Sequence, residues 1–168
     1  MKANKNSLRK RLRFLSLSAI IAALYVVTTY FIAPIASGPI QVRLSEALIA
    51  LAVFTPAAIP GLSVGCLIAN MLMGSMPLDV VFGSLATLIG AVGGYYLGKV
   101  NKYLAPIPTI LSNALIIPFV LKFVYGEKAL IPFMMLTVGV GEVISAGIIG
   151  ALLIFVISKN KKLEESLK

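Results

Sequence analysis

The sequence predicts an all-α integral membrane protein with six transmembrane helices and both termini in the cytoplasm. Three observations predict this: 59% of the 168 residues are hydrophobic, the mean hydropathy is +0.99, and Pro and Gly separate the apolar runs. Soluble domains are usually about 45–50% apolar. Because the chain has one Cys and no His, an internal disulfide is excluded and we expect no zinc or haem site.

The first three helices are expected in the N-terminal half. A bilayer core of about 30 Å needs about 20 helical residues, and residues 14–33 provide them. This stretch is longer than the apolar core of a signal peptide, about 7–15 residues, so we expect a retained span. Residues 44–58 and 61–73 are two shorter helices. Pro and Gly between them predict a tight hairpin.

Three longer helices are expected in the second half, at residues 78–97, 107–124 and 131–158. The last is longer than one span requires. We therefore expect it to tilt, to kink near Pro132 or to begin above the membrane.

Basic residues indicate the orientation. Twelve of the 15 Lys and Arg lie before the first span, after the last span or in the loop that holds Lys99 and Lys102. The positive-inside rule places all three segments in the cytoplasm, which agrees with six spans. Clusters beside spans are better explained by the membrane than by nucleic-acid binding. We expect a basic segment (1–13), a membrane domain (14–158) and a basic tail (159–168), in the plasma membrane.

Polar side chains gather in the half of the membrane domain that faces away from the basic segments. Burying such groups near lipid costs several kcal/mol unless they are paired or hydrated. We therefore expect them to line a pocket for a small polar molecule, open to the outside. Tyr25 and Tyr30 could stack on a flat ring there. The other expected pocket residues are Gln41, Arg43, Glu46, Asn70, Asp79 and Glu142.

Most of these residues also have a purely structural interpretation. Arg43 and Glu46 stand three positions apart and could pair on a helix. Asp79 begins a helix, where the dipole favours a carboxylate, and Asn70 could bond between helices. Glu142 has no comparable alternative, and the two tyrosines could be core or interface aromatics.

Small residues at a spacing of four favour close helix contacts. We interpret the glycine pairs as packing inside the bundle. The pairs are Gly61 with Gly65, Gly90 with Gly94 and Gly94 with Gly98, and Ala19 and Ala23 share the spacing.

Two sequence signatures of enzymes are incomplete in this chain. Residues 93–99 fit G-x-x-x-x-G-K, but Val100 stands where a phosphate-binding loop needs Ser or Thr. The lack of His removes a Ser-His-Asp or Cys-His mechanism. We therefore expect a protein that is not an enzyme and holds no cofactor, with any ATP used by a partner.

Three segments together resemble the substrate-binding (S) components of energy-coupling factor (ECF) transporters, of the QueT type. They are residues 41–48 (QVRLSEAL), 60–70 (PGLSVGCLIAN) and 78–88 (LDVVFGSLATL). The resemblance covers most of residues 14–158. It implies an S component that captures a queuosine precursor outside and delivers it inward with a membrane coupling subunit and two ATPases.

The resemblance also implies roles for single residues. Ala19 and Ala23 would dock on the coupling subunit, and residues 34–40 would form a lid. A 7-deazaguanine ligand offers an adjacent N–H and NH₂, which a carboxylate can accept. We expect Glu142 and Asp79 on the ligand, Arg43 and Glu46 in the wall, and Gln41 and Asn70 as amide partners.

Three alternatives stay open. The chain could be an S component for another vitamin. Only a panel of ligands would separate this alternative from an S component for a queuosine precursor. It could be a membrane packing or assembly protein whose small-residue faces bind partners. A stand-alone channel or carrier is the third, and the charge-poor cytoplasmic half argues against it.

Overall fold

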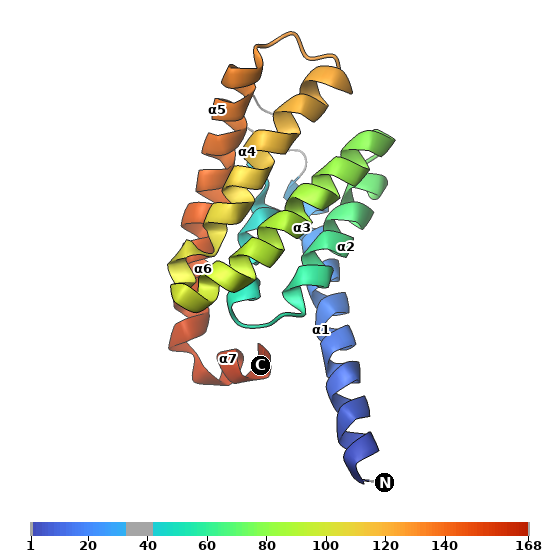
Figure 1. The fold of residues 1–168 in the computed structure, drawn as a ribbon, viewed down its shortest axis with the longest axis vertical. Helices are drawn as coiled ribbons and strands as arrows, with labels where there is room; N and C mark the ends of the chain where they lie inside the picture. The colour runs from blue at the N-terminus through green and yellow to red at the C-terminus, as the bar shows by residue number, and fades with distance from the viewer. Residues whose placement is uncertain (1, 33–41, 168) are drawn as a thin grey trace.

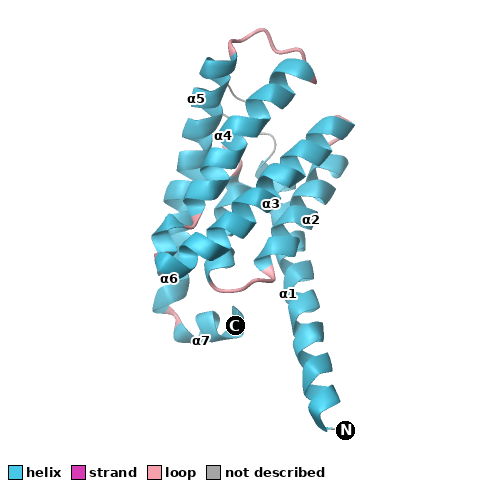
Figure 2. Ribbon diagram, viewed as in Figure 1, coloured by secondary structure: helices cyan, strands magenta, loops and turns pink. Residues whose placement is uncertain are grey.

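The protein is a bundle of helices. The computed structural model describes residues 2–32 and 42–167, and in these ranges the regular elements are all helical (Figure 2). The start of α1 and the helix α7 lie at one end of the bundle, and the loop over residues 124–130 lies at the opposite end (Figure 1).

In the described ranges, four helices are long and apolar enough to cross a membrane by length and composition. The first is longer than expected, because the basic residues continue it to Lys2. The long helices are α1 (Lys2–Ile32), α3 (Pro77–Val100), α4 (Pro106–Phe123) and a rod made of α5 (Ile131–Glu142), η3 (Val143–Ile149) and α6 (Gly150–Lys159).

The second and third predicted spans correspond to shorter helices, η1 (Leu44–Val53) and α2 (Ala58–Leu72). Both are apolar but shorter than the about 20 residues of a lone span, so the six-span topology stays a prediction. The expected α-helix over 44–58 is wrong, because η1 is a 3₁₀ helix that ends at Val53. Pro56 follows, and it has no N–H with which to continue the helix.

The 3₁₀ helix η1 lies in the middle of the bundle. It contacts α1, α2, α3, α4, η3 and α6. Runs of 3₁₀ helix rarely exceed 3–4 residues, and here the packing of six neighbours supports ten. Small side chains let those neighbours approach, since Ala47, Ala50 and Ala52 are all buried.

Glycines set the spacing between neighbouring helices. A Cβ on Gly65 of α2 would lie 2.8 Å from Tyr25 Cβ of α1. A Cβ on Gly90 of α3 would lie 2.8 Å from Thr109 Cα of α4. The prediction that the glycine pairs serve internal packing is therefore confirmed. Gly61 faces α1 in the same way, and Gly94 and Gly98 face Ala105 at the start of α4.

The C-terminal rod changes its winding beside the centre of the bundle. Pro132 lies in the first turn of α5, where a proline is tolerated, and the change of winding lies further along the rod. There, η3 is a π-helical stretch that begins directly after Glu142 and contacts η1. Such stretches are frequent at functional sites.

The basic segments meet at one end of the bundle. Arg13 of α1 donates hydrogen bonds to the carbonyl oxygens of Glu165 and Ser166 in α7 (Lys161–Leu167), at 3.2 and 3.1 Å. Lys102, in the short helix η2 (Lys102–Leu104), donates to Ser158 Oγ at 3.0 Å. The N-terminal segment, the α3–α4 connection and the C-terminal tail therefore lie on the same side.

Candidate functional site

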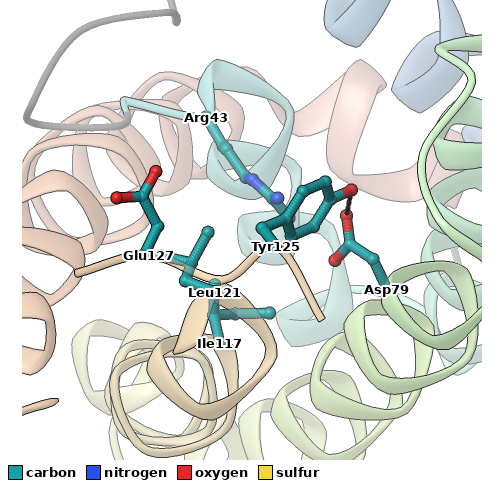
Figure 3. A pocket seen from close by; sticks show the side chains of 6 residues that line it. All are labelled: Arg43, Asp79, Ile117, Leu121, Tyr125 and Glu127. Carbon is teal, nitrogen blue, oxygen red and sulfur yellow. Dashed lines mark hydrogen bonds between the residues drawn. The ribbon is translucent and has the colours of Figure 1, made fainter. Parts of the chain in front are cut away.

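A cavity of about 280 Å³ lies at the end of the bundle opposite the basic segments (Figure 3). Sites for small molecules usually measure about 300–1,000 Å³, so this cavity suits a compact ligand. Two aliphatic side chains form one wall, and polar side chains form the rest. The lining residues are Arg43, Asp79, Ile117, Leu121, Tyr125 and Glu127.

Asp79 is held at the cavity by a tyrosine from a loop that is far away in the sequence. It lies in the first turn of α3, is 6% exposed, and accepts a hydrogen bond from Tyr125 Oη to Oδ2 at 2.8 Å. Tyr125 Oη in turn accepts one from the backbone N–H of Met76 at 3.3 Å. Partial burial and the bond to Asp79 raise the pKa of Tyr125 above its ordinary 10.0, so its hydroxyl stays protonated at neutral pH. Oδ1 of Asp79 accepts no hydrogen bond from the described residues.

Arg43 brings a cation to the same cavity. It is extended, half-buried and directly precedes η1. Its guanidinium interacts electrostatically with Glu46 and Asp79, yet it forms no hydrogen bond or ion pair with any residue in the described ranges. The alternative that Arg43 simply pairs with Glu46 on a helix is therefore not supported.

Glu46 lies deeper, in the middle of the bundle. It is 2% exposed and accepts hydrogen bonds from Tyr25 Oη at 2.5 Å and from Thr87 Oγ1 at 3.5 Å. Glu46 therefore joins η1 to α1 and to α3. Tyr25 is buried in this contact, which leaves its ring no open face for stacking.

Glu142 is the second deeply buried carboxylate, with 2% of its surface exposed. It lies beside Asn113 of α4, and it interacts electrostatically with Glu46 and Arg43. Within the described chain, neither Glu142 Oε2 nor Asn113 Nδ2 has a hydrogen-bond partner. An unsatisfied buried acceptor costs about 1–3 kcal/mol. Glu142 is not among the residues that line the cavity.

Asn70 lies close to Asp79. A Cβ on Gly83 would be 3.0 Å from Asn70 Nδ2 and 3.7 Å from Asp79 Oδ1, so both side chains lie beside this glycine. Asn70 Nδ2 also donates weakly to Cys66 Sγ at 3.6 Å. The amide is 7% exposed and could join a ligand group at Asp79.

One expected site residue, Tyr30, is not brought to this group. Tyr30 is 62% exposed on α1 and stacks edge-on against Phe31, because its helix position points away from the bundle. Gln41 lies outside the described residues, as does the expected lid over 34–40.

The structure adds two cavity residues that the sequence analysis misses, Tyr125 and Glu127. Both lie in the α4–α5 loop, on either side of Gly126, whose φ of +70° favours glycine. The signal that could have identified them is the sequence Tyr-Gly-Glu directly after an apolar helix, at the end opposite the basic segments.

The residues expected to dock on a partner, Ala19 and Ala23, lie on a free face of α1. Ala19 and Ala23 are exposed, and Ile20, Leu24 and Val27 on the same helix are 46–56% exposed. The opposite face of α1 packs on α2 through Ile21 and Tyr25. The small-residue face therefore has no neighbour within the described chain.

Comparisons with known proteins give the family of this chain. The queuosine precursor transporter QueT of Lactococcus lactis subsp. cremoris (strain MG1363) is 42% identical over 73 residues, which are 42% of this chain and 43% of that protein. The aligned part thus spans less than half of the relative. No solved structure matches this chain. The sequence model of the QueT transporter family matches residues 15–159, and the chain therefore belongs to the QueT transporter family.

Proposed function

We propose that this chain is the substrate-capture (S) subunit of an ATP-driven ECF importer and that it binds a queuosine precursor. The ligand would be a 7-deazaguanine such as 7-aminomethyl-7-deazaguanine, or queuine or queuosine. The observation that carries the proposal is the cavity in which Asp79 and Arg43 face the same space. Membership of the QueT family and the name of the Lactococcus relative support it.

The chemistry of the cavity fits a guanine-like ring. Such a ring has an N–H and an NH₂ side by side on one edge, with a carbonyl oxygen next to them. A carboxylate such as Asp79 accepts from both donors, and a guanidinium such as Arg43 donates to the carbonyl. Ile117 and Leu121 provide an apolar wall for the face of the ring.

The remaining expected residues would act around this core. Glu142 would be a second hydrogen-bond acceptor for the ligand, deeper in the bundle. Its Oε2 has no donor among the described residues. Glu46 would hold η1 in place through Tyr25. Asn70 and Gln41 would add amide hydrogen bonds, Asn70 from its place beside Asp79.

The proposal includes topology and partners. Six helices would cross the plasma membrane, with both termini in the cytoplasm, because the basic segments meet at one end of the bundle. The face with Ala19 and Ala23 would dock on a membrane coupling subunit. Two ATPases would supply the energy, and this chain would hold no cofactor. The segments 1–13, 14–158 and 159–168 keep their expected roles.

Two other functions remain as outcomes of the test. A packing or assembly protein would use its glycine faces to bind partners, but Gly61, Gly65, Gly90 and Gly94 all pack inside the bundle. An S component for another vitamin would keep the fold and change the ligand.

The test is calorimetric binding of 7-aminomethyl-7-deazaguanine to the full chain in detergent, with guanine and thiamine as controls. Tight binding of the deazaguanine alone supports the proposal. No heat with folded protein overturns the substrate, and a wider vitamin panel then separates the two remaining functions. Uptake into liposomes by this chain alone would overturn the need for partners.

A further inference from the structure

We propose that Glu127 selects ligands that carry a cationic amine, by binding the ammonium group at the mouth of the cavity. This inference rests on the proposed function, because it names the part of a deazaguanine ligand that this residue reads. Glu127 lines the cavity together with Asp79 and Arg43. It is exposed, and its carboxylate forms no hydrogen bond or ion pair with the described part of the chain.

The backbone around Glu127 is fixed. Its N–H donates to the carbonyl oxygen of Leu121 at 3.1 Å. Lys122 Nζ donates to the carbonyl oxygens of Lys128 and Ala129, at 3.4 and 3.2 Å. The ammonium of Lys122 is therefore engaged by backbone oxygens, and the carboxylate of Glu127 forms no ion pair with the described residues.

The order of charged groups around the cavity matches the order of groups around the ligand. Figure 3 shows Arg43 between Glu127 on one side and the Tyr125–Asp79 pair on the other, with Leu121 and Ile117 along the remaining edge. Along the edge of 7-aminomethyl-7-deazaguanine, the N–H and NH₂ donors come first, then the carbonyl oxygen, then the aminomethyl group. With the donors on Asp79 and the carbonyl on Arg43, the amine lies toward Glu127.

The charges around the cavity also place the amine of the ligand beside Glu127. An alkyl amine is protonated at neutral pH, and in this pose the ammonium lies on the far side of Arg43 from Asp79. Arg43 repels a cation, so the amine needs a carboxylate of its own. Glu127 is the cavity carboxylate placed to supply it, whereas a neutral substituent gains nothing from this residue.

The test compares two ligands that share one ring, 7-aminomethyl- and 7-cyano-7-deazaguanine, whose nitrile is neutral. Binding of both to the full chain in detergent is measured by calorimetry for the parent, Glu127→Gln and Glu127→Asp. Glu165→Gln is the matched control, because it removes the same charge from the exposed surface of α7.

We expect Glu127→Gln to weaken binding of the amine about tenfold, as suits a lost charge-assisted hydrogen bond, and to leave binding of the nitrile unchanged. Glu127→Asp should fall between, and Glu165→Gln should match the parent. If Glu127→Gln lowers the affinity for both ligands equally, or does not lower the affinity for the amine, the role of Glu127 is overturned while the proposed function stands. If the folded parent binds neither deazaguanine, both proposals fall.

Discussion

Tyr125 Oη lies 2.8 Å from Asp79 Oδ2, and this contact joins the α4–α5 loop to the first turn of α3. The two residues are 46 positions apart in the sequence. The same hydroxyl accepts from Met76 N–H, so one tyrosine connects the loops on two sides of the cavity. The contact engages Oδ2 of Asp79, whereas Oδ1 accepts no hydrogen bond from the described residues.

Tyr125→Phe should speed ligand release. The substitution removes a hydrogen bond to a charged acceptor, worth about 1.5–3 kcal/mol, so the dissociation rate should rise by about tenfold or more. Stopped-flow displacement of 7-aminomethyl-7-deazaguanine measures this rate. Tyr96→Phe is the control, because Tyr96 is 61% exposed on α3. Tighter binding by Tyr125→Phe would instead mean that the tyrosine competes with the ligand for Asp79.

Glu142→Gln should weaken ligand binding by about tenfold without lowering the melting temperature. The ligand loses one acceptor oxygen of Glu142, while the bundle keeps a side chain of nearly the same shape at this buried position. Calorimetry and thermal unfolding of the same preparation separate the two effects. A lower melting temperature with unchanged affinity would assign Glu142 to the structure alone.

Gly65→Ala should destabilise the bundle by about 1–3 kcal/mol, as overpacking does. The new Cβ would lie 2.8 Å from Tyr25 Cβ and 3.0 Å from Ala22 Cα, where the neighbouring helix cannot yield easily. Gly139→Ala is the matched control, since its Cβ would meet Ala114 at an ordinary 3.7 Å. Thermal unfolding in detergent should show a lower midpoint for Gly65→Ala alone, and equal midpoints would contradict the close approach of α1 and α2.

Ala19→Leu should abolish uptake in cells that contain the partner subunits and leave ligand binding by the isolated chain unchanged. The side chain is exposed, so a larger residue disturbs no internal contact. Radiolabelled uptake and calorimetry check the two halves of this prediction. Val81→Ala, on the exposed surface of α3, controls for general effects on expression. If uptake survives in Ala19→Leu, this face is not the docking surface.

Apart from the start of α1, the long helices could be predicted closely from apolar runs and flanking prolines, because length and composition decide where such helices form. The 3₁₀ winding of η1 and the π winding of η3 could not be predicted in this way. Both depend on packing between segments far apart in sequence, as with Glu46 of η1, which bonds to Tyr25 and Thr87. A local pattern of apolar residues does not distinguish 3₁₀, α and π winding.

The candidate site could be predicted in part. Asp79 and Arg43 stand out because charge is rare in apolar surroundings, and both line the cavity. Tyr125 and Glu127 do not stand out, since tyrosine and glutamate are ordinary in a loop between two helices. Whether these two residues belong to a site depends on which helix ends lie next to that loop, and only the fold determines this.

The two faces of α1 have a consequence for genetics. Substitutions at Ile21, Ala22 and Tyr25 fall on the side that packs against α2, so they should reduce the amount of protein in the cell. Substitutions at Ala19 and Ala23 should leave that amount normal and still abolish growth on the transported compound. Second-site suppressors of the first class should map within this chain, and suppressors of the second class should map to the gene of the coupling subunit.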